Sequence, residues 1–280
     1  MSTSVSTWQE GDVQTNGITL HYYRTGGDKP PLVLAHGITD SGLCFERVAR
    51  ALETDYDLIL VDARGHGHST KPETGYAPSD HAADLAGLID GLGLARPGVI
   101  GHSMGASTAS YLAAGWPDRV RGLILEDPPW RSLTDAGIDP ASRDLYHRRI
   151  LDRQAMTIDE VIAQGRSLNP KWSEEDFPAW AAAKHQVVPQ VTEAATARRR
   201  AWAEVIAEIQ CPTLVLIGEQ GVSGSDVPAI VTPELAAEAR NLNANLQIAE
   251  IPGAGHNIRR DQFDAYIAAV RPFLERLFAA

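Results

Sequence analysis

Two glycine-containing segments supply a serine and a histidine of the kind that hydrolytic chemistry requires. Gly101-His102-Ser103-Met104-Gly105 follows an apolar run over 97–100 and precedes a helical pattern over 106–114. A serine held in a sharp turn between a strand and a helix needs glycines on both sides, because larger side chains would clash there. The spacing predicts that Ser103 is a nucleophile for acyl transfer.

His256 is the candidate base for this serine. It follows the last strand-like run, comes after Gly253 and Gly255, and precedes the terminal helical pattern. A histidine at this point could also be a buried core residue. We favour the catalytic interpretation, because the carboxyl end of the last strand lies on the rim that carries the serine turn.

The elements that must position these residues form an α/β pattern. Strand-like runs around 8–13 and 18–23, separated by Asn16 and Gly17, predict an antiparallel hairpin. From residue 31 onward, short continuous apolar runs alternate with helical stretches, which is typical of a parallel sheet covered on both faces. Six such runs and the hairpin predict an eight-stranded, mostly parallel sheet. Helices are expected near 43–53, 80–93, 104–115, 233–240 and 260–278.

One long interval interrupts this alternation. The chain between the sixth strand, which ends at Glu126, and the next strand, which begins at Pro212, is far longer than a simple crossover. We interpret it as a helical cap, with core segments over 1–127 and 209–280 and the cap over 128–208. The candidate substrate-binding residues, each of which could instead pack the interior of the cap, are its aromatic side chains Trp130, Trp172, Phe177 and Trp180.

Four segments together resemble the α/β-hydrolase superfamily. They are LAHGITDS at 34–41, the stretch over 62–69, the GHSMG turn, and IPGAGH at 251–256. The resemblance covers nearly the whole chain outside the cap and implies a Ser103–His256 pair. It also implies an oxyanion hole that consists of the backbone N–H groups of Ile38 and Met104, and it implies no cofactor.

The acid of the expected triad is not in its usual place. In most of the superfamily it is an aspartate after the seventh strand, where this chain has Gly218-Glu219-Gln220-Gly221. Glu126, at the end of the sixth strand, is our preferred acid, and the position is similar to that in zearalenone-type lactone hydrolases. Asp226, then Asp127, are the weighed alternatives, together with a dyad that lacks an acid.

The expected reaction is hydrolysis of a carboxylic ester or lactone of an apolar small molecule through an acyl-enzyme on Ser103. Two alternatives stay open. Relatives that cleave carbon–carbon bonds of diketone-type ring-fission products use a similar serine and histidine, and some members of the fold bind ligands with low turnover.

Composition limits the remaining possibilities. The net charge of −11 argues against nucleic acid as a partner, and no long apolar run predicts a membrane span. Without a recognisable secretory signal, a cytoplasmic location is expected. Cys44 and Cys211 have no metal-ligand spacing and are expected to be packing thiols. The arginine run 198–200 is interpreted as a solvated surface, and the oligomeric state stays open.

Overall fold

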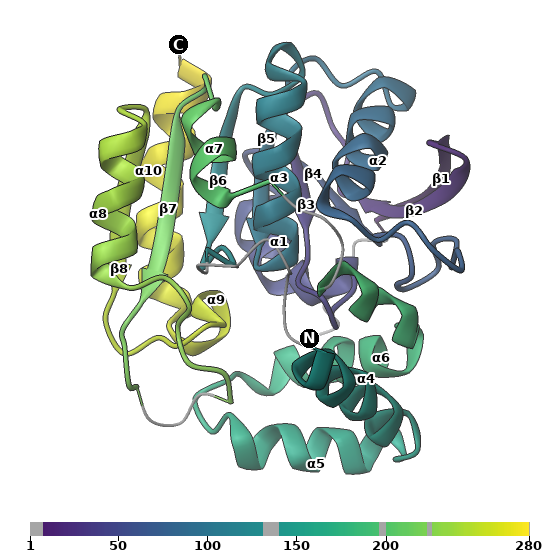
Figure 1. Ribbon diagram of the computed structural model, residues 1–280. Coiled ribbons are helices and arrows are strands. Elements are labelled where there is room, and N and C mark those ends of the chain that lie inside the picture. Colours follow the sequence, from purple (N-terminus) through teal and green to yellow (C-terminus); the bar gives the residue numbers. More distant parts are fainter. Residues whose placement is uncertain (1–7, 131–139, 196–199, 223–225, 280) are drawn as a thin grey trace, which may run out of the picture.

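The fold is a single eight-stranded sheet with helices on both faces (Figure 1). It is seen in a computed structural model that describes residues 8–130, 140–195, 200–222 and 226–279. The strand order is β1-β2-β4-β3-β5-β6-β7-β8. The hairpin β1–β2 and the pair β2–β4 are antiparallel, and every other pair is parallel. This confirms the predicted α/β class and the eight-stranded, mostly parallel sheet.

The strands are short, and those in the centre of the sheet are buried along nearly their whole length. All five residues of β4, β5 and β6 are buried, as expected for strands that helices cover on both faces. The strands are β1 (Gln9–Thr15), β2 (Ile18–Arg24), β3 (Pro31–Ala35), β4 (Asp57–Val61), β5 (Gly98–His102), β6 (Gly122–Glu126), β7 (Thr213–Gly218) and β8 (Leu246–Ile251).

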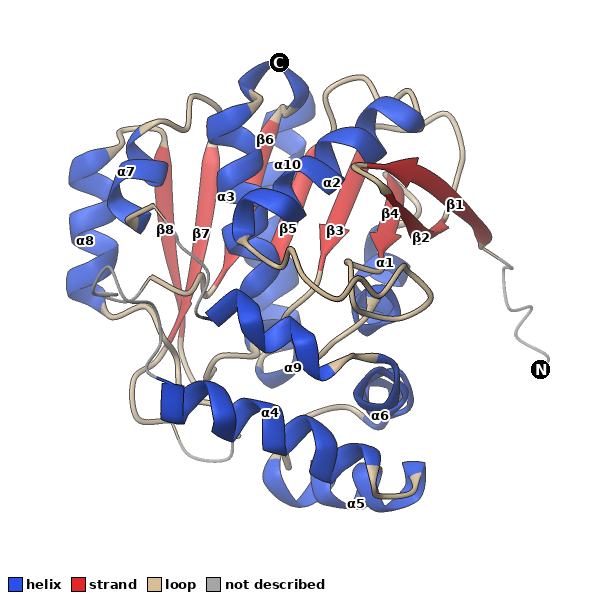
Figure 2. Ribbon diagram, turned by 45° about the vertical axis from the view of Figure 1, so that its right-hand side comes forward, coloured by secondary structure: helices blue, strands red, loops and turns tan. Residues whose placement is uncertain are grey.

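Two groups of helices cover the two faces of the sheet (Figure 2). One face packs against α2 (Pro78–Gly91), α3 (Met104–Gly115), α7 (Trp202–Ala207) and α8 (Pro233–Leu242). The other face packs against α1 (Glu46–Leu52), α9 (Ile258–Asp261) and α10 (Phe263–Ala279). Short 3₁₀ turns lie at Gly42–Phe45, Pro117–Arg119, Glu174–Asp176 and Pro189–Ala195.

The alternation of side chains along each strand separates the two cores. In β6, Leu123 and Leu125 point into the core under α2 and α3, whereas Ile124 points into the core under α1 and α10. Neighbouring strands follow the same rule, because successive side chains of a strand leave on opposite faces. This alternation decides to which face of the sheet each polar side chain at the carboxyl end of a strand points.

Three helices lie beyond the carboxyl ends of the strands. They are α4 (Pro140–Gln154), α5 (Ile158–Leu168) and α6 (Phe177–Gln186), and they gather at the lower end of the molecule in both views (Figures 1 and 2). They belong to the interval that the sequence predicts to be a cap, and they are called the cap helices below. Among the described residues, no helix has both the length and the apolar character that a membrane span requires.

The helix predicted at 260–278 is divided in the structure. The short α9 ends at Asp261, the next residue Gln262 has a non-helical φ of −143° and ψ of 64°, and α10 begins at Phe263. The break lets α9 carry Arg259 and Arg260 into the interior, where both are buried. The predicted helix over 104–115 coincides with α3. Of the arginine run, Arg198 and Arg199 lie outside the described residues.

Gly105 offers a test of how tightly α3 packs on the sheet. A Cβ added at Gly105 would lie 2.0 Å from the carbonyl oxygen of Ala35, whereas a Cβ at Gly115 would meet nothing within 4 Å. We expect Gly105→Ala to lower the free energy of unfolding by about 3 kcal/mol or more, because overpacking here pushes on backbone. Gly115→Ala, the control on the same helix, should change it by less than about 1 kcal/mol in either direction. Urea unfolding of both variants measures this, and equal effects would contradict the packing argument.

Candidate active site

Ser103 stands in a strained turn between β5 and α3. Its φ is 50° and its ψ is −112°, a conformation that non-glycine residues rarely adopt. Its backbone N–H donates to the carbonyl oxygen of Glu126 at 3.0 Å, which fixes the turn against β6. A Cβ at Gly101 would lie 2.3 Å from the carbonyl oxygen of Gly105, so both glycines of the motif are required sterically. The strain therefore presents the serine side chain at the end of the sheet.

A cavity of about 460 Å³ lies between this turn and the cap helices. This volume suits a small organic molecule. Ser103 and His256 both line the cavity, and so do Ile38 and Met104, the two residues predicted to supply oxyanion N–H groups. The structure thus brings all four of these predicted residues to one cavity.

Asp127 holds the ring of His256. Its Oδ2 lies 2.5 Å from His256 Nδ1, in a contact that is buried from solvent. The backbone N–H groups of Ile230 and Val231 donate to the same carboxylate at 2.8–3.2 Å. These donors orient the carboxylate and satisfy its oxygens in the buried site. The contact directs the other ring nitrogen of His256, Nε2, away from Asp127.

The expectation that Glu126 contacts His256 is wrong. The carboxylate of Glu126 instead accepts hydrogen bonds from the backbone N–H of Arg259 at 2.9 Å and from Nη1 of Arg259 at 3.1 and 3.2 Å. The other weighed acid, Asp226, has its Oδ2 3.5 Å from Nη2 of Arg153, on the cap side of the cavity. Asp127, ranked below both from the sequence, is the carboxylate at the histidine.

The two acids differ in their contacts because successive side chains of β6 point to opposite faces of the sheet. Glu126 continues the face of Ile124, which leads to α9 and Arg259, whereas Asp127 leaves on the opposite side. Asp127 also has a φ of 39°, so the chain turns sharply directly after the strand and carries the carboxylate toward the histidine loop. Because Leu123, Ile124 and Leu125 are all apolar, the sequence of β6 alone does not show which face of the strand leads to the histidine loop.

The loop after β3 is braced by two buried histidines. His36 Nε2 accepts from the backbone N–H of Ala63 at 3.0 Å, so Nδ1 carries the proton and donates to the carbonyl oxygen of Gly37 at 2.8 Å. His66 Nε2 lies 2.7 Å from the carbonyl oxygen of Ile38. Burial lowers the pKa of both imidazoles to about 4. These contacts fix the peptide groups on either side of Ile38.

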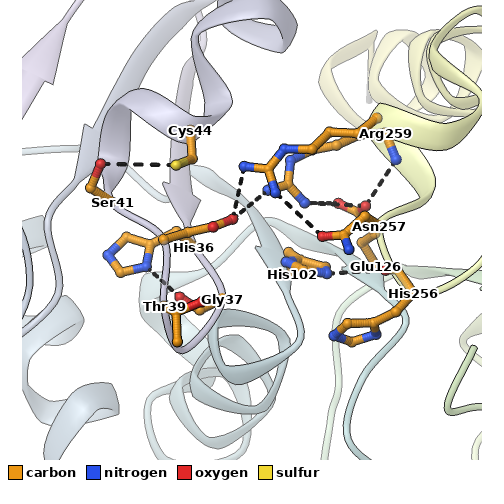
Figure 3. A network of polar contacts seen from close by, with 12 residues as sticks. His36, Gly37, Thr39, Ser41, Cys44, His102, Glu126, His256, Asn257 and Arg259 are labelled. Carbon is orange, nitrogen blue, oxygen red and sulfur yellow. Dashed lines mark hydrogen bonds and ion pairs between the residues drawn. The ribbon is translucent and has the colours of Figure 1, made fainter. Parts of the chain in front are cut away.

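His102 connects the nucleophile turn to the histidine loop. Its ring centroid lies 4.7 Å from that of His256, and its Nε2 is 3.1 Å from the backbone carbonyl oxygen of His256 (Figure 3). Burial, followed by the charge of Arg259, holds the pKa of His102 well below its ordinary value. The neutral ring therefore donates from Nε2 and fixes the backbone of His256 beside Ser103.

The four predicted aromatic residues divide into two pairs. Trp172 and Trp180 line the cavity, with their rings 5.8 Å apart in an edge-on arrangement. Phe177 is buried against both indoles and is not among the residues that line the cavity. Trp130 stacks on Trp202 in the core under α3, also away from the cavity. The structure therefore places Phe177 and Trp130 as packing residues, and of the four predicted aromatic residues only Trp172 and Trp180 are placed where a ligand could contact them.

A buried ionic cluster, of which Figure 3 labels Glu126 and Arg259, ties the edges of the site together. Asp40 Oδ2 accepts from Nη2 of Arg259 at 2.9 Å and from Nη2 of Arg260 at 3.0 Å, and Asp40 Oδ1 lies 3.1 Å from Nζ of Lys184. Burial alone would raise the pKa of Asp40, but these three cations hold it well below its ordinary value. Because Arg259 also pairs with Glu126, the cluster joins β6, α9, the loop after β3 and α6.

Sequence reasoning missed the cations of the cavity wall. Arg149, Arg153, Lys184 and Arg260 all line the cavity. A signal was available for the first two, since Tyr146, Arg149, Ile150 and Arg153 have the spacing of one helix face. Among the described residues, no group of three or more His, Cys, Asp or Glu side chains could hold a metal ion, and Cys44 and Cys211 are buried free thiols.

The buried His36 predicts a loss of stability in mild acid. The unfolded imidazole titrates near pH 6.5 and the folded one near 4, so the unfolded chain binds more protons between these values. As the pH decreases through this window, the contribution of His36 to the free energy of unfolding should decrease, by up to about 1.4 kcal/mol per pH unit. We expect His36→Gln to remove this part of the slope and the exposed-site control His68→Gln to retain it. Urea unfolding from pH 7 to pH 4 measures it, and an unchanged slope in His36→Gln would exclude His36 as the source.

Comparison with known proteins places this geometry in a family. A model of the alpha/beta hydrolase family matches residues 32–269. The chain is 31% identical over 268 residues to an N-formylmaleamate deformylase of Pseudomonas putida, covering 95% of this chain and 96% of the relative. It is 29% identical over 273 residues to a 2-(acetamidomethylene)succinate hydrolase of Mesorhizobium japonicum, covering 94% of each chain.

A solved structure agrees with these matches. The crystal structure of an E-2-(acetamidomethylene)succinate hydrolase superimposes with a TM-score of 0.79 at 26% identity, covering 96% of this chain and 99% of that one. The overlap therefore includes the cap helices as well as the sheet. The chain belongs to the alpha/beta hydrolase family and is an enzyme of the hydrolase class.

Proposed function

We propose that this protein is a serine hydrolase that cleaves an acyl bond of a small molecule through an acyl-enzyme on Ser103. The observation that carries the proposal is the arrangement around one cavity. A strained serine directly precedes α3, and a histidine at the same cavity has its Nδ1 held by a buried carboxylate 2.5 Å away. This is the arrangement that a serine nucleophile, its base and the acid that orients the base require.

The geometry supports a definite course for the reaction. His256 Nε2 takes the proton of Ser103 Oγ as the oxygen attacks the carbonyl carbon, and Asp127 stabilises the imidazolium that forms. The backbone N–H groups of Ile38 and Met104 stabilise the oxyanion, helped by the N-terminus of α3. Collapse of the intermediate expels the leaving group, which takes the proton from His256. Water then hydrolyses the acyl-enzyme with the same histidine as base.

The bond is a carboxylic ester, a lactone or an N-acyl bond in a molecule with an apolar skeleton. Trp172 and Trp180 in the cavity wall support an unsaturated or ring-bearing skeleton. The names of the two relatives contain an N-formyl and an acetamido group, which supports including N-acyl substrates beside the expected esters and lactones.

Carbon–carbon hydrolysis is the second candidate reaction, because the same serine and histidine serve it in similar enzymes. A panel that contains esters, lactones, N-acyl compounds and diketone-type ring-fission products separates these bond types. A ligand-binding protein with low turnover would cleave none of them at a useful rate.

Labelling with a fluorophosphonate probe tests the nucleophile. We expect the wild type to be labelled and to hydrolyse 4-nitrophenyl hexanoate, and Ser103→Ala to lose labelling and several orders of magnitude in kcat. The control is Ser107→Ala, which removes another serine that lines the same cavity one turn along α3. It should keep both properties. A folded wild-type protein that neither reacts with the probe nor cleaves any member of the panel would contradict the proposal.

The two adjacent acids should respond differently to neutralisation. Asp127→Asn keeps the shape of the side chain, and asparagine tolerates the positive φ, but it loses the charge beside His256. We expect kcat to fall about 10⁴-fold. Glu126→Gln should keep kcat within about tenfold and instead lower the free energy of unfolding by about 3 kcal/mol, because Arg259 loses its buried partner. Kinetics and urea unfolding of both variants test this, and the opposite pattern would restore Glu126 as the acid.

A further inference from the structure

The cavity carries more positive charge than the protein as a whole. Its described lining contains four cationic side chains, Arg149, Arg153, Lys184 and Arg260, against the three carboxylates Asp40, Asp152 and Asp226. The complete chain, by contrast, has a net charge of −11. A locally positive cavity in an acidic protein is an arrangement that attracts anions to that site and repels them elsewhere.

The carboxylate of Asp40 does not neutralise this wall. It is shared among Lys184, Arg259 and Arg260, and within the described residues only Arg259 of these three has a second carboxylate, Glu126. Burial lowers the pKa of Lys184 to about 8 against the attraction of Asp40, and the charges of Arg260 and Arg153 add smaller contributions in the same direction as burial. The inner end of the cavity therefore has an excess of positive charge.

Of the two arginines that α4 gives to this wall, Arg149 is exposed and Arg153 is the partly buried one that has donors to spare. Within the described part of the chain, its Nε donates to Oε1 of Gln164 at 3.3 Å and its Nη2 reaches Asp226 at 3.5 Å, both long contacts. A guanidinium has five N–H donors, so most of them stay available. The side chain is 20% exposed and its guanidinium lies 5.4 Å from the ring centroid of Trp180. The aromatic wall and the free donors are thus adjacent.

The two buried cations of the wall have fewer donors left for a ligand. Lys184 already donates to the carbonyl oxygen and hydroxyl of Thr39 and to Asp40, which accounts for all three of its N–H groups. Arg260 is buried and holds Asp40 and Asn257, with its guanidinium 4.7 Å from the ring centroid of Trp172. These two residues supply a positive field, and Arg153 supplies the direct contact.

We propose that the substrate cleaved at Ser103 carries a carboxylate group that Arg153 binds, in the field of Lys184 and Arg260. The inference rests on the proposed function and adds the substrate class: a small carboxylic acid whose apolar part contacts Trp172 and Trp180. An arginine suits this role because its planar donors match the two oxygens of a carboxylate.

A matched pair of esters tests the inference. The 4-nitrophenyl monoester of adipic acid and 4-nitrophenyl hexanoate have the same leaving group and six-carbon acyl chains, and only the first has a terminal carboxylate. After subtraction of the uncatalysed rates, we expect the wild type to have a kcat/KM at least tenfold higher for the anionic ester. Arg153→Gln should lower that value about ten- to hundredfold and leave the neutral ester within about twofold.

The control variant is Arg148→Gln. Arg148 lies on α4 beside Arg149, is exposed and does not line the cavity, so its loss changes the net charge equally without touching the proposed site. The ratio of the two kcat/KM values should stay at that of the wild type. Arg153→Lys, which keeps the charge but not the planar donors, should give a ratio of kcat/KM values between those of the wild type and Arg153→Gln. It replaces Arg153→Gln as the test variant if that protein does not fold.

Binding without turnover separates this inference from the proposed function. Titration calorimetry of Ser103→Ala with adipate should show saturable binding that weakens at least tenfold when Arg153→Gln is added, and the neutral adipamide should not bind. Such binding in a protein that cleaves no ester would support the carboxylate site while contradicting the proposed reaction. Cleavage of both esters with equal losses in Arg153→Gln, together with no binding of adipate, would overturn the carboxylate site while the hydrolase stands.

Discussion

The buried contact of Asp40 with three cations is the interaction on which the arrangement of the site depends. Asp40 lies in the loop after β3, two residues beyond Ile38, and its partners come from α9 and α6. Charges taken out of water are tolerated only when they stay paired, and removing one partner of a buried pair costs about 3–5 kcal/mol. The loop, the helix after His256 and the cap helix α6 therefore cannot separate without a large loss of stability.

The same cluster explains why two adjacent acids end β6. Glu126 binds Nη1 and the backbone N–H of Arg259 and so anchors α9, the helix that directly follows the His256 loop. Asp127, on the other side of the strand, contacts the imidazole itself. One carboxylate fixes where the histidine loop lies and the next fixes how its ring is oriented. This division of roles is possible within two consecutive residues because successive side chains of a strand leave on opposite faces.

The features that can be predicted from the sequence depend on local patterns. Six short apolar runs and the hairpin pattern predict the eight strands, and the glycines around Ser103 predict its turn, because a side chain there would collide with backbone. The choice between Glu126 and Asp127 depends instead on the face from which each side chain leaves and on a loop distant in sequence. The roles of the aromatic residues in the cap cannot be predicted from local patterns either. Phe177 and Trp180 are aromatic neighbours, yet only Trp180 lines the cavity, and burial against protein or against a ligand looks alike in sequence.

The position of Lys184 connects recognition with chemistry. Its ammonium group lies 4.8 Å from the ring centroid of Trp180, which lines the cavity, and it donates to the carbonyl oxygen of Thr39 at 2.7 Å. Thr39 directly follows Ile38, whose own carbonyl oxygen is held by His66. The contacts of Lys184 with Thr39 and Asp40 thus link the cap helix α6 to the loop after β3, beside the packing of Trp180 and Cys44 in one apolar cluster. The wall that would hold a ligand and the loop proposed to supply an oxyanion N–H therefore have a common buried support.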